Sequence, residues 1–196
     1  MATASKKTTR ASASPASRTP ARKTARATDA TVLLRADHKR VSDLFEQYEG
    51  TRSQAKKKSL VASICAELTV HAQVEEEIFY PAVKAAIKDK ELVPEATVEH
   101  ATLKELIAQV EGKEPDGEMF DAKIKVMSEY VKHHVKEEQN EMFPKARASK
   151  LDLNELGERI AARKQELMES QPSGAGKGGL LTRVVDAFTQ APAEVG

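Results

Sequence analysis

The chain has 196 residues, enough for one domain with an apolar core and additional tails. Charged residues make up 31% of it, aromatic residues are scarce and Trp is absent, a composition that predicts amphipathic helices and an all-α class. The single cysteine, Cys65, excludes an intrachain disulfide, and no apolar run approaches the roughly 20 residues that a membrane span requires. We therefore expect a soluble cytoplasmic protein that makes no contact with a membrane.

The N-terminal segment differs in composition from the rest of the chain. Residues 1–30 hold seven Lys or Arg and one Asp, a net charge of +6, whereas the other 166 residues carry 24 basic and 29 acidic side chains, a net of −5. The segment has almost no large apolar side chain to offset the entropy lost on ordering. Residues 1–28 are therefore predicted to be a disordered tail that aids solubility, binds nucleic acid nonspecifically through phosphate charge, or acts as a transit peptide.

Two helices are predicted next along the chain. The first begins at Thr28 or Asp29 as N-cap and ends before Gly50, and the second extends from about Arg52 to Asp89. Helical spacing aligns Leu34, His38, Val41, Phe45 and Tyr48 in the first, and Leu60, Ile64, Leu68, His71, Glu75 and Ile78 in the second. Each predicted core row therefore includes ionisable side chains.

Two more long helices follow. The third begins near Val93 and Pro94, carries His100, Leu103, Ile107 and Val110 in one row, and is broken by GKEPDG at 112–117. The fourth aligns Phe120, Ile124, Met127, Val131, His134, Glu138 and Met142. Four such helices with short connections predict an up-down-up-down four-helix bundle over residues 29–147.

The remaining segments are predicted to lie outside the bundle. A shorter helix within 148–170 begins at Asp152, where Glu155 completes a pattern like a capping box. Residues 171–196 are predicted to form a flexible linker followed by a short amphipathic tail.

A sequence repeat points to the chemistry of the core. HAQVEEEIFYP at 71–81 and HVKEEQNEMFP at 134–144 share His, Glu and Pro at the same offsets, and His-x3-Glu places both groups on one helix face. The predicted core set is His38, His71, Glu75, His100, His134 and Glu138. Burying even one neutral polar group without a partner costs roughly 2–7 kcal/mol. Four imidazoles and two carboxylates suit one pair of metal ions with bridging carboxylates, and ligation without thiolate favours iron or manganese over structural zinc.

Other residues compete for these roles. His133 lies about 100° around the helix from His134, and only His134 keeps the ten-residue distance to Pro144 that His71 keeps to Pro81. We expect Glu76, Glu77, Glu137 and Glu141 to form a solvated acidic face, Tyr48, Tyr80 and Tyr130 to serve in packing, and Cys65 to be a small core residue. No histidine has a Glu three residues before it, so the Glu-x-x-His pattern of ferritin-like di-iron proteins is absent.

The set of His38, His71-x3-Glu75, His100 and His134-x3-Glu138 resembles the hemerythrin HHE cation-binding family over residues 30–147. The resemblance implies a non-haem centre of two iron ions that reacts with dioxygen, nitric oxide or peroxide. Oxygen-carrying members have a fifth His, one turn beyond the position of His100, and a longer His-to-Asp spacing on the fourth helix. Lys104 occupies the fifth position here, and we expect it to turn outward or pair with a carboxylate.

The expected function is a metal protein that binds, senses or detoxifies dioxygen, nitric oxide or peroxide, or buffers iron. One alternative is a di-iron enzyme with catalase-like, peroxidase-like or nitric-oxide-consuming activity. Another is a nucleic-acid-associated stress protein that acts through its basic tail.

Overall fold

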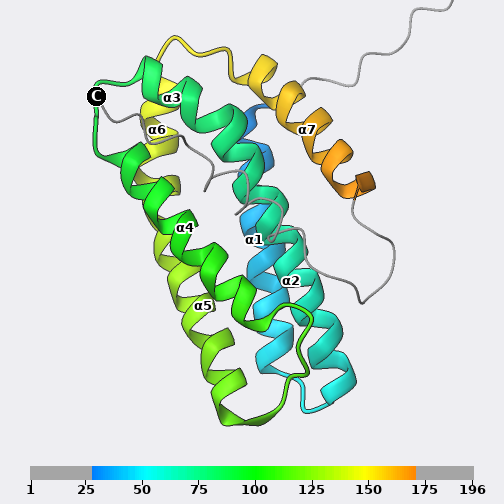
Figure 1. Cartoon of the computed structure of the whole chain (residues 1–196). Coiled ribbons are helices and arrows are strands. Elements are labelled where there is room, and N and C mark those ends of the chain that lie inside the picture. Colours follow the sequence, from blue (N-terminus) through cyan, green and yellow to red (C-terminus); the bar gives the residue numbers. More distant parts are fainter. Residues whose placement is uncertain (1–27, 171–196) are drawn as a thin grey trace, which may run out of the picture.

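The structure, a computed structural model, describes residues 28–170, so predictions for residues 1–27 and 171–196 lie outside the described range. Its long helices are α1 (Ala30–Glu49), α2 (Gln54–Val74), α4 (Leu92–Val110) and α5 (Gly117–Glu137). They run alternately up and down, with α1 packed against α2 and α5, and α2 against α4 (Figure 1). Residues 28–170 contain no strand, and the predicted all-α four-helix bundle is confirmed.

Side-chain caps explain where several helices begin. Asp29 Oδ1 accepts a hydrogen bond from the backbone N–H of Thr31 at 2.7 Å, and Ser53 caps α2 in the same way. Asp89, predicted inside the second helix, instead lies in the connection to α4 and accepts from the N–H of Glu91. The second helical segment ends at Ala86, so its predicted C-terminal boundary was three residues too late.

Two π-helical turns interrupt what were predicted to be regular helices. The turn η1 (Glu75–Phe79) joins α2 to α3 (Tyr80–Ala86), and η2 (Glu138–Met142) joins α5 to α6 (Phe143–Ala148). In each, an N–H bonds the carbonyl five residues earlier, Tyr80 to Glu75 and Phe143 to Glu138. A proline follows both turns, and because proline lacks an N–H and clashes with the carbonyl four residues back, a wider turn relieves the conflict.

The last helix, α7 (Leu153–Ser170), lies along α1 and α2 outside the bundle (Figure 1). Asp152 Oδ1 accepts from the N–H of Glu155 at its start, as the sequence predicts. The backbone of Thr28 passes so close to Gly157 that a Cβ there would overlap the Thr28 carbonyl oxygen. The absence of a side chain at Gly157 therefore allows α7 to pack against the beginning of α1.

The core consists of two apolar clusters. One surrounds Leu34, Val74 and Phe143, and the other surrounds Phe45, Ile64 and Met127. Along α1, α2 and α4 the buried histidine lies between residues of the two clusters; on α1, for example, His38 lies between Leu34 and Val41. His134 of α5 likewise lies between Val131 and Met142 of η2. The four histidines therefore form a polar layer across the bundle. No helix within residues 28–170 is long and apolar enough to cross a bilayer.

Candidate metal centre

All six side chains predicted from the sequence are buried and close together, each from the expected row of its helix. His38 Nε2 lies 3.0 Å from His71 Nε2, and His100 Nε2 lies 3.1 Å from His134 Nε2. The first pair comes from α1 and α2, and the second from α4 and α5. The bundle therefore brings the four histidines together as two pairs.

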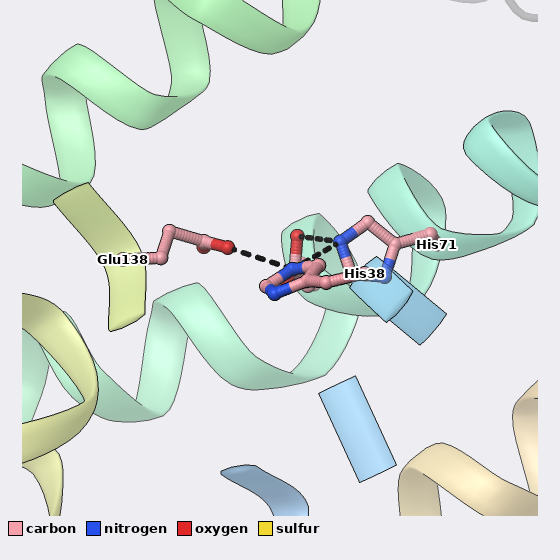
Figure 2. Close-up of side chains that lie close together, drawn as sticks. His38, His71 and Glu138 are labelled. Atoms are coloured by element: carbon pink, nitrogen blue, oxygen red, sulfur yellow. Dashed lines mark hydrogen bonds and ion pairs between the residues drawn. The ribbon is translucent and has the colours of Figure 1, made fainter. Parts of the chain in front are cut away.

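Each carboxylate contacts one histidine from each pair. Glu75 Oε2 lies 3.2 Å from His71 Nε2 and 3.5 Å from His100 Nε2. Glu138 Oε2 lies 3.2 Å from His38 Nε2 and 3.6 Å from His134 Nε2. Figure 2 shows Glu138 reaching from η2 toward His38 and His71. This geometry is that of two sites joined by two carboxylates.

The outward-facing Nδ1 atoms of the histidines meet side chains that the sequence prediction did not include. Asp37 Oδ2 lies 3.7 Å from His71 Nδ1, and Glu99 Oε2 lies 2.6 Å from His134 Nδ1. The corresponding neighbour of His100 Nδ1 is Glu76 Oε1, at 3.1 Å. His38 differs, because the Gln139 Nε2 amide donates to its Nδ1 at 2.9 Å while Gln139 Oε1 accepts from Arg35. A carboxylate that accepts from Nδ1–H leaves the Nε2 lone pair facing the centre, the arrangement found around metal-bound histidines.

Glu76 and Lys104 form one connected group. Glu76 was expected on a solvated acidic face, but it contacts His100 and receives two hydrogen bonds from Lys104 Nζ, at 2.7 and 2.6 Å. Lys104 therefore pairs with a carboxylate, one of its two expected alternatives. The spacing of residues within one helix could not identify Glu76 as a neighbour of the centre, because its partners His100 and Lys104 lie on another helix, α4.

Tyr80 also belongs to the centre, contrary to its expected packing role. Its hydroxyl donates to Glu138 Oε1 at 2.9 Å and lies 3.3 Å from His100 Nε2. In a regular α-helix Tyr80 would point about 140° away from Glu75. The π turn η1 brings the two onto one face, and the Pro81 that follows is the sequence signal that could have indicated this turn.

The remaining candidates lie outside the centre. The His133 side chain is 60% exposed, whereas that of His134 is 6% exposed, which supports the predicted register of the fourth helix. Tyr48 donates to Asp121 at 2.6 Å. Cys65 is buried in the second apolar cluster, and burial raises the pKa of its thiol to about 12.

Two of the buried groups, His71 and Glu138, favour their charged forms although burial opposes charge. Burial alone would lower the pKa of His71, but the Glu75 and Asp37 carboxylates outweigh that effect and raise this pKa to about 10. Burial alone would raise the pKa of Glu138, but His38 and His134 hold it at about 2. Burial is the main reason that the pKa of His38 is lowered. The carboxylates thus favour positive charge between them, which either protons or metal ions can provide.

The donor set fits metal ions. Among the described residues, Glu75 Oε1 and Glu138 Oε2 are buried side-chain oxygens without a hydrogen-bond partner. Facing Nε2 atoms about 3 Å apart also need a proton or a cation between them. Two candidate metal groups follow from these positions: His38, His71, Glu75 and Glu138 form one, and Glu75, His100 and His134 form the other.

The fold and this buried cluster define a metal-binding four-helix bundle. The family model described as "Hemerythrin HHE cation binding domain" matches residues 29–146, and the chain belongs to this family. The family resemblance seen in the sequence is thereby confirmed, together with the cation-binding character that it implies.

The chain is similar to one protein of known structure and to one protein compared by sequence. A hemerythrin HHE cation binding domain-containing protein of Mycobacterium kansasii has a similar fold, with a TM-score of 0.64 and 22% identity over 73% of this chain and 89% of that one. A protein of Nostoc sp. named "DNA nickase" is 27% identical over 111 residues, which are 57% of this chain. The match spans only 31% of that relative's length.

Proposed function

We propose that the centre holds two iron ions and that the protein binds, senses or detoxifies dioxygen, nitric oxide or peroxide, or buffers iron. The observation that carries this proposal is that both carboxylates connect the two histidine pairs. Glu75 contacts one histidine of each pair, and so does Glu138. His38 and His71 would hold one ion, and His100 and His134 the other. Imidazole and carboxylate donors without thiolate favour iron or manganese over structural zinc.

The surrounding residues suit a small ligand. Iron ions held by these histidines and carboxylates would supply redox chemistry and could accept a small ligand. The Tyr80 hydroxyl is buried, and burial together with the nearby carboxylates raises its pKa well above the usual 10. It therefore stays protonated and donates to Glu138 Oε1, so it would reach the oxygen of a bound ligand only by turning away from that carboxylate. The same donor supports the alternative of a peroxide-decomposing or nitric-oxide-consuming enzyme.

Metal analysis and absorption spectroscopy test the proposal. Protein from iron-replete cells should contain about two iron ions per chain and absorb in the near ultraviolet through ligand-to-metal charge transfer. Peroxide or nitric oxide turnover by the same sample would favour the enzyme, and binding without turnover would favour a sensor or buffer. A folded, metal-free chain that takes up no ferrous iron anaerobically would refute the di-iron proposal.

A second candidate function is nonspecific association with nucleic acid. It rests on the net charge of +6 within residues 1–30, which suits contact with phosphates. The name of the Nostoc relative refers to DNA, but the match spans only 31% of that relative's length. The test is a DNA-binding measurement with and without the tail.

A further inference from the structure

A second group of metal-binding side chains lies outside the centre, between α4 and α5. We propose that Glu99, His133 and Glu137, here named the transit cluster, pass divalent cations between solvent and the buried centre. The inference rests on the proposed function, since it assigns the route by which that centre is loaded and emptied.

The transit cluster has the donors and the gradation of exposure that a passage needs. Its three ligand atoms lie within 4.8 Å of one another. His133 Nε2 lies 3.2 Å from Glu137 Oε1 and 3.8 Å from Glu99 Oε1. The side chains are 60% exposed at His133, 32% at Glu137 and 11% at Glu99. The cluster thus leads from solvent toward the interior.

Glu99 connects the transit cluster to the centre. Its Oε1 faces His133, while its Oε2 lies 2.6 Å from Nδ1 of His134, one of the proposed ligands. One carboxylate therefore contacts both the outer cluster and the inner site. A cation held beside Glu99 would be separated from the centre by a single imidazole ring.

A cavity of about 10 Å³ lies at the same place, which is room for one water-sized species. Glu95, Glu99 and Glu137 line it together with His134 and Glu138 of the centre. Glu138 is 1% exposed, and its Oε2 accepts no hydrogen bond although His38 and His134 are near. Because Glu138 and His134 belong to the centre and Glu99 and Glu137 belong to the transit cluster, this cavity lies between the two groups of donors.

The chemistry favours passage over storage. Carboxylates can replace water ligands of a divalent cation one at a time, which lowers the cost of dehydration before the ion reaches the interior. Negative charge at the exposed end of the transit cluster also raises the local cation concentration and the rate at which cations associate. Because His133 is largely exposed, an ion held there would exchange readily with solvent.

Kinetics of loading and release test the role. The full chain, freed of metal with a chelator and checked for helix content, is mixed anaerobically with ferrous iron, and iron-loaded protein is separately mixed with a ferrous chelator. The double variant His133→Ala/Glu137→Gln is compared with the unmodified chain. The matched control is Glu129→Gln, which removes an exposed carboxylate of α5 outside the cluster.

We expect uptake and release in the double variant to slow by the same factor, on the order of tenfold, with the affinity for iron unchanged. Removing a residue that acts only on the path raises the barrier equally in both directions and leaves the equilibrium unchanged. Rates equal to those of the unmodified chain, equal slowing in Glu129→Gln, or a loss of affinity would each overturn the inference. An unmodified chain that takes up no iron would overturn the proposed function as well, so the two failures are distinguishable.

Discussion

His71 and His134 sit one turn before Glu75 and Glu138, and both imidazoles point their Nε2 atoms into the polar layer. Replacing either by Ala should remove metal and leave neighbouring buried groups without partners, which costs roughly 1–3 kcal/mol per group. We therefore expect His71→Ala and His134→Ala to lose iron and to melt at lower temperature. Metal analysis and thermal unfolding measure both effects.

His133→Ala is the control for these variants. Its side chain is mostly exposed and is not one of the proposed ligands, so the iron content at equilibrium and the melting temperature should stay unchanged. Loss of iron in His133→Ala with retention in His134→Ala would mean that the helix is shifted by one residue.

Glu76 should hold the His100 ring in place, whereas Lys104 acts on that ring only through Glu76. Removing the carboxylate partner of a metal-bound histidine typically lowers metal affinity 10- to 100-fold. We expect a loss of that order in Glu76→Ala, and an unchanged iron stoichiometry in Lys104→Ala. A competition titration against a chelator gives the affinities, and loss of one iron from Lys104→Ala would show that Lys104 contributes to ligation.

At the level of single elements, the packing of α7 depends on close backbone contact at Gly157. Alanine normally favours a helix by about 1 kcal/mol over glycine, but here its Cβ would overlap the carbonyl oxygen of Thr28. We expect Gly157→Ala to destabilise the chain by about 1–3 kcal/mol, as overpacking does. Glu158→Ala, at an exposed position of the same helix, should have little effect on the denaturation midpoint. Equal midpoints for the two variants would contradict the proposed contact.

At the level of the whole molecule, the polar layer lies between two apolar clusters, so metal binding and bundle stability should be linked. A ligand that binds only the folded state at 1,000 times its Kd adds about 4 kcal/mol to the free energy of unfolding. Chelation should consequently lower the melting temperature of the unmodified chain. His71→Ala, already depleted of metal, should respond little to the chelator. Identical melting curves with and without metal would contradict this linkage.

Deleting residues 1–27 tests the separation of tail and bundle. None of the proposed ligands lies in this segment, and the deletion keeps Thr28 and the Asp29 cap, so iron content and helix content should be unchanged. Any DNA binding should disappear, and in the intact chain it should weaken steeply with salt, because phosphate contacts release counterions. Binding that survives the deletion would place the basic surface on the bundle.

The sequence by itself determined the helices, their inward rows and the six proposed ligands. These features depend on local spacing: a period of 3.6 residues places His71 and Glu75, or His134 and Glu138, on one face, and burial of ionisable groups requires compensation. The family pattern then specified cation binding. The repeat of His, Glu and Pro was visible because both halves of the site are built on the same helical geometry.

Only the tertiary structure decided which neighbours surround those ligands. Asp37, Glu76, Glu99 and Gln139 contact histidines from other helices, and no periodicity within one helix identifies partners that meet through packing. Tyr80 joined the centre because a π turn changed the phase of the helix after Glu75, which a regular 3.6-residue period excludes. The pairing of the histidines through the two carboxylates likewise arose from how α1, α2, α4 and α5 pack, since contacts across a bundle depend on which helices become neighbours.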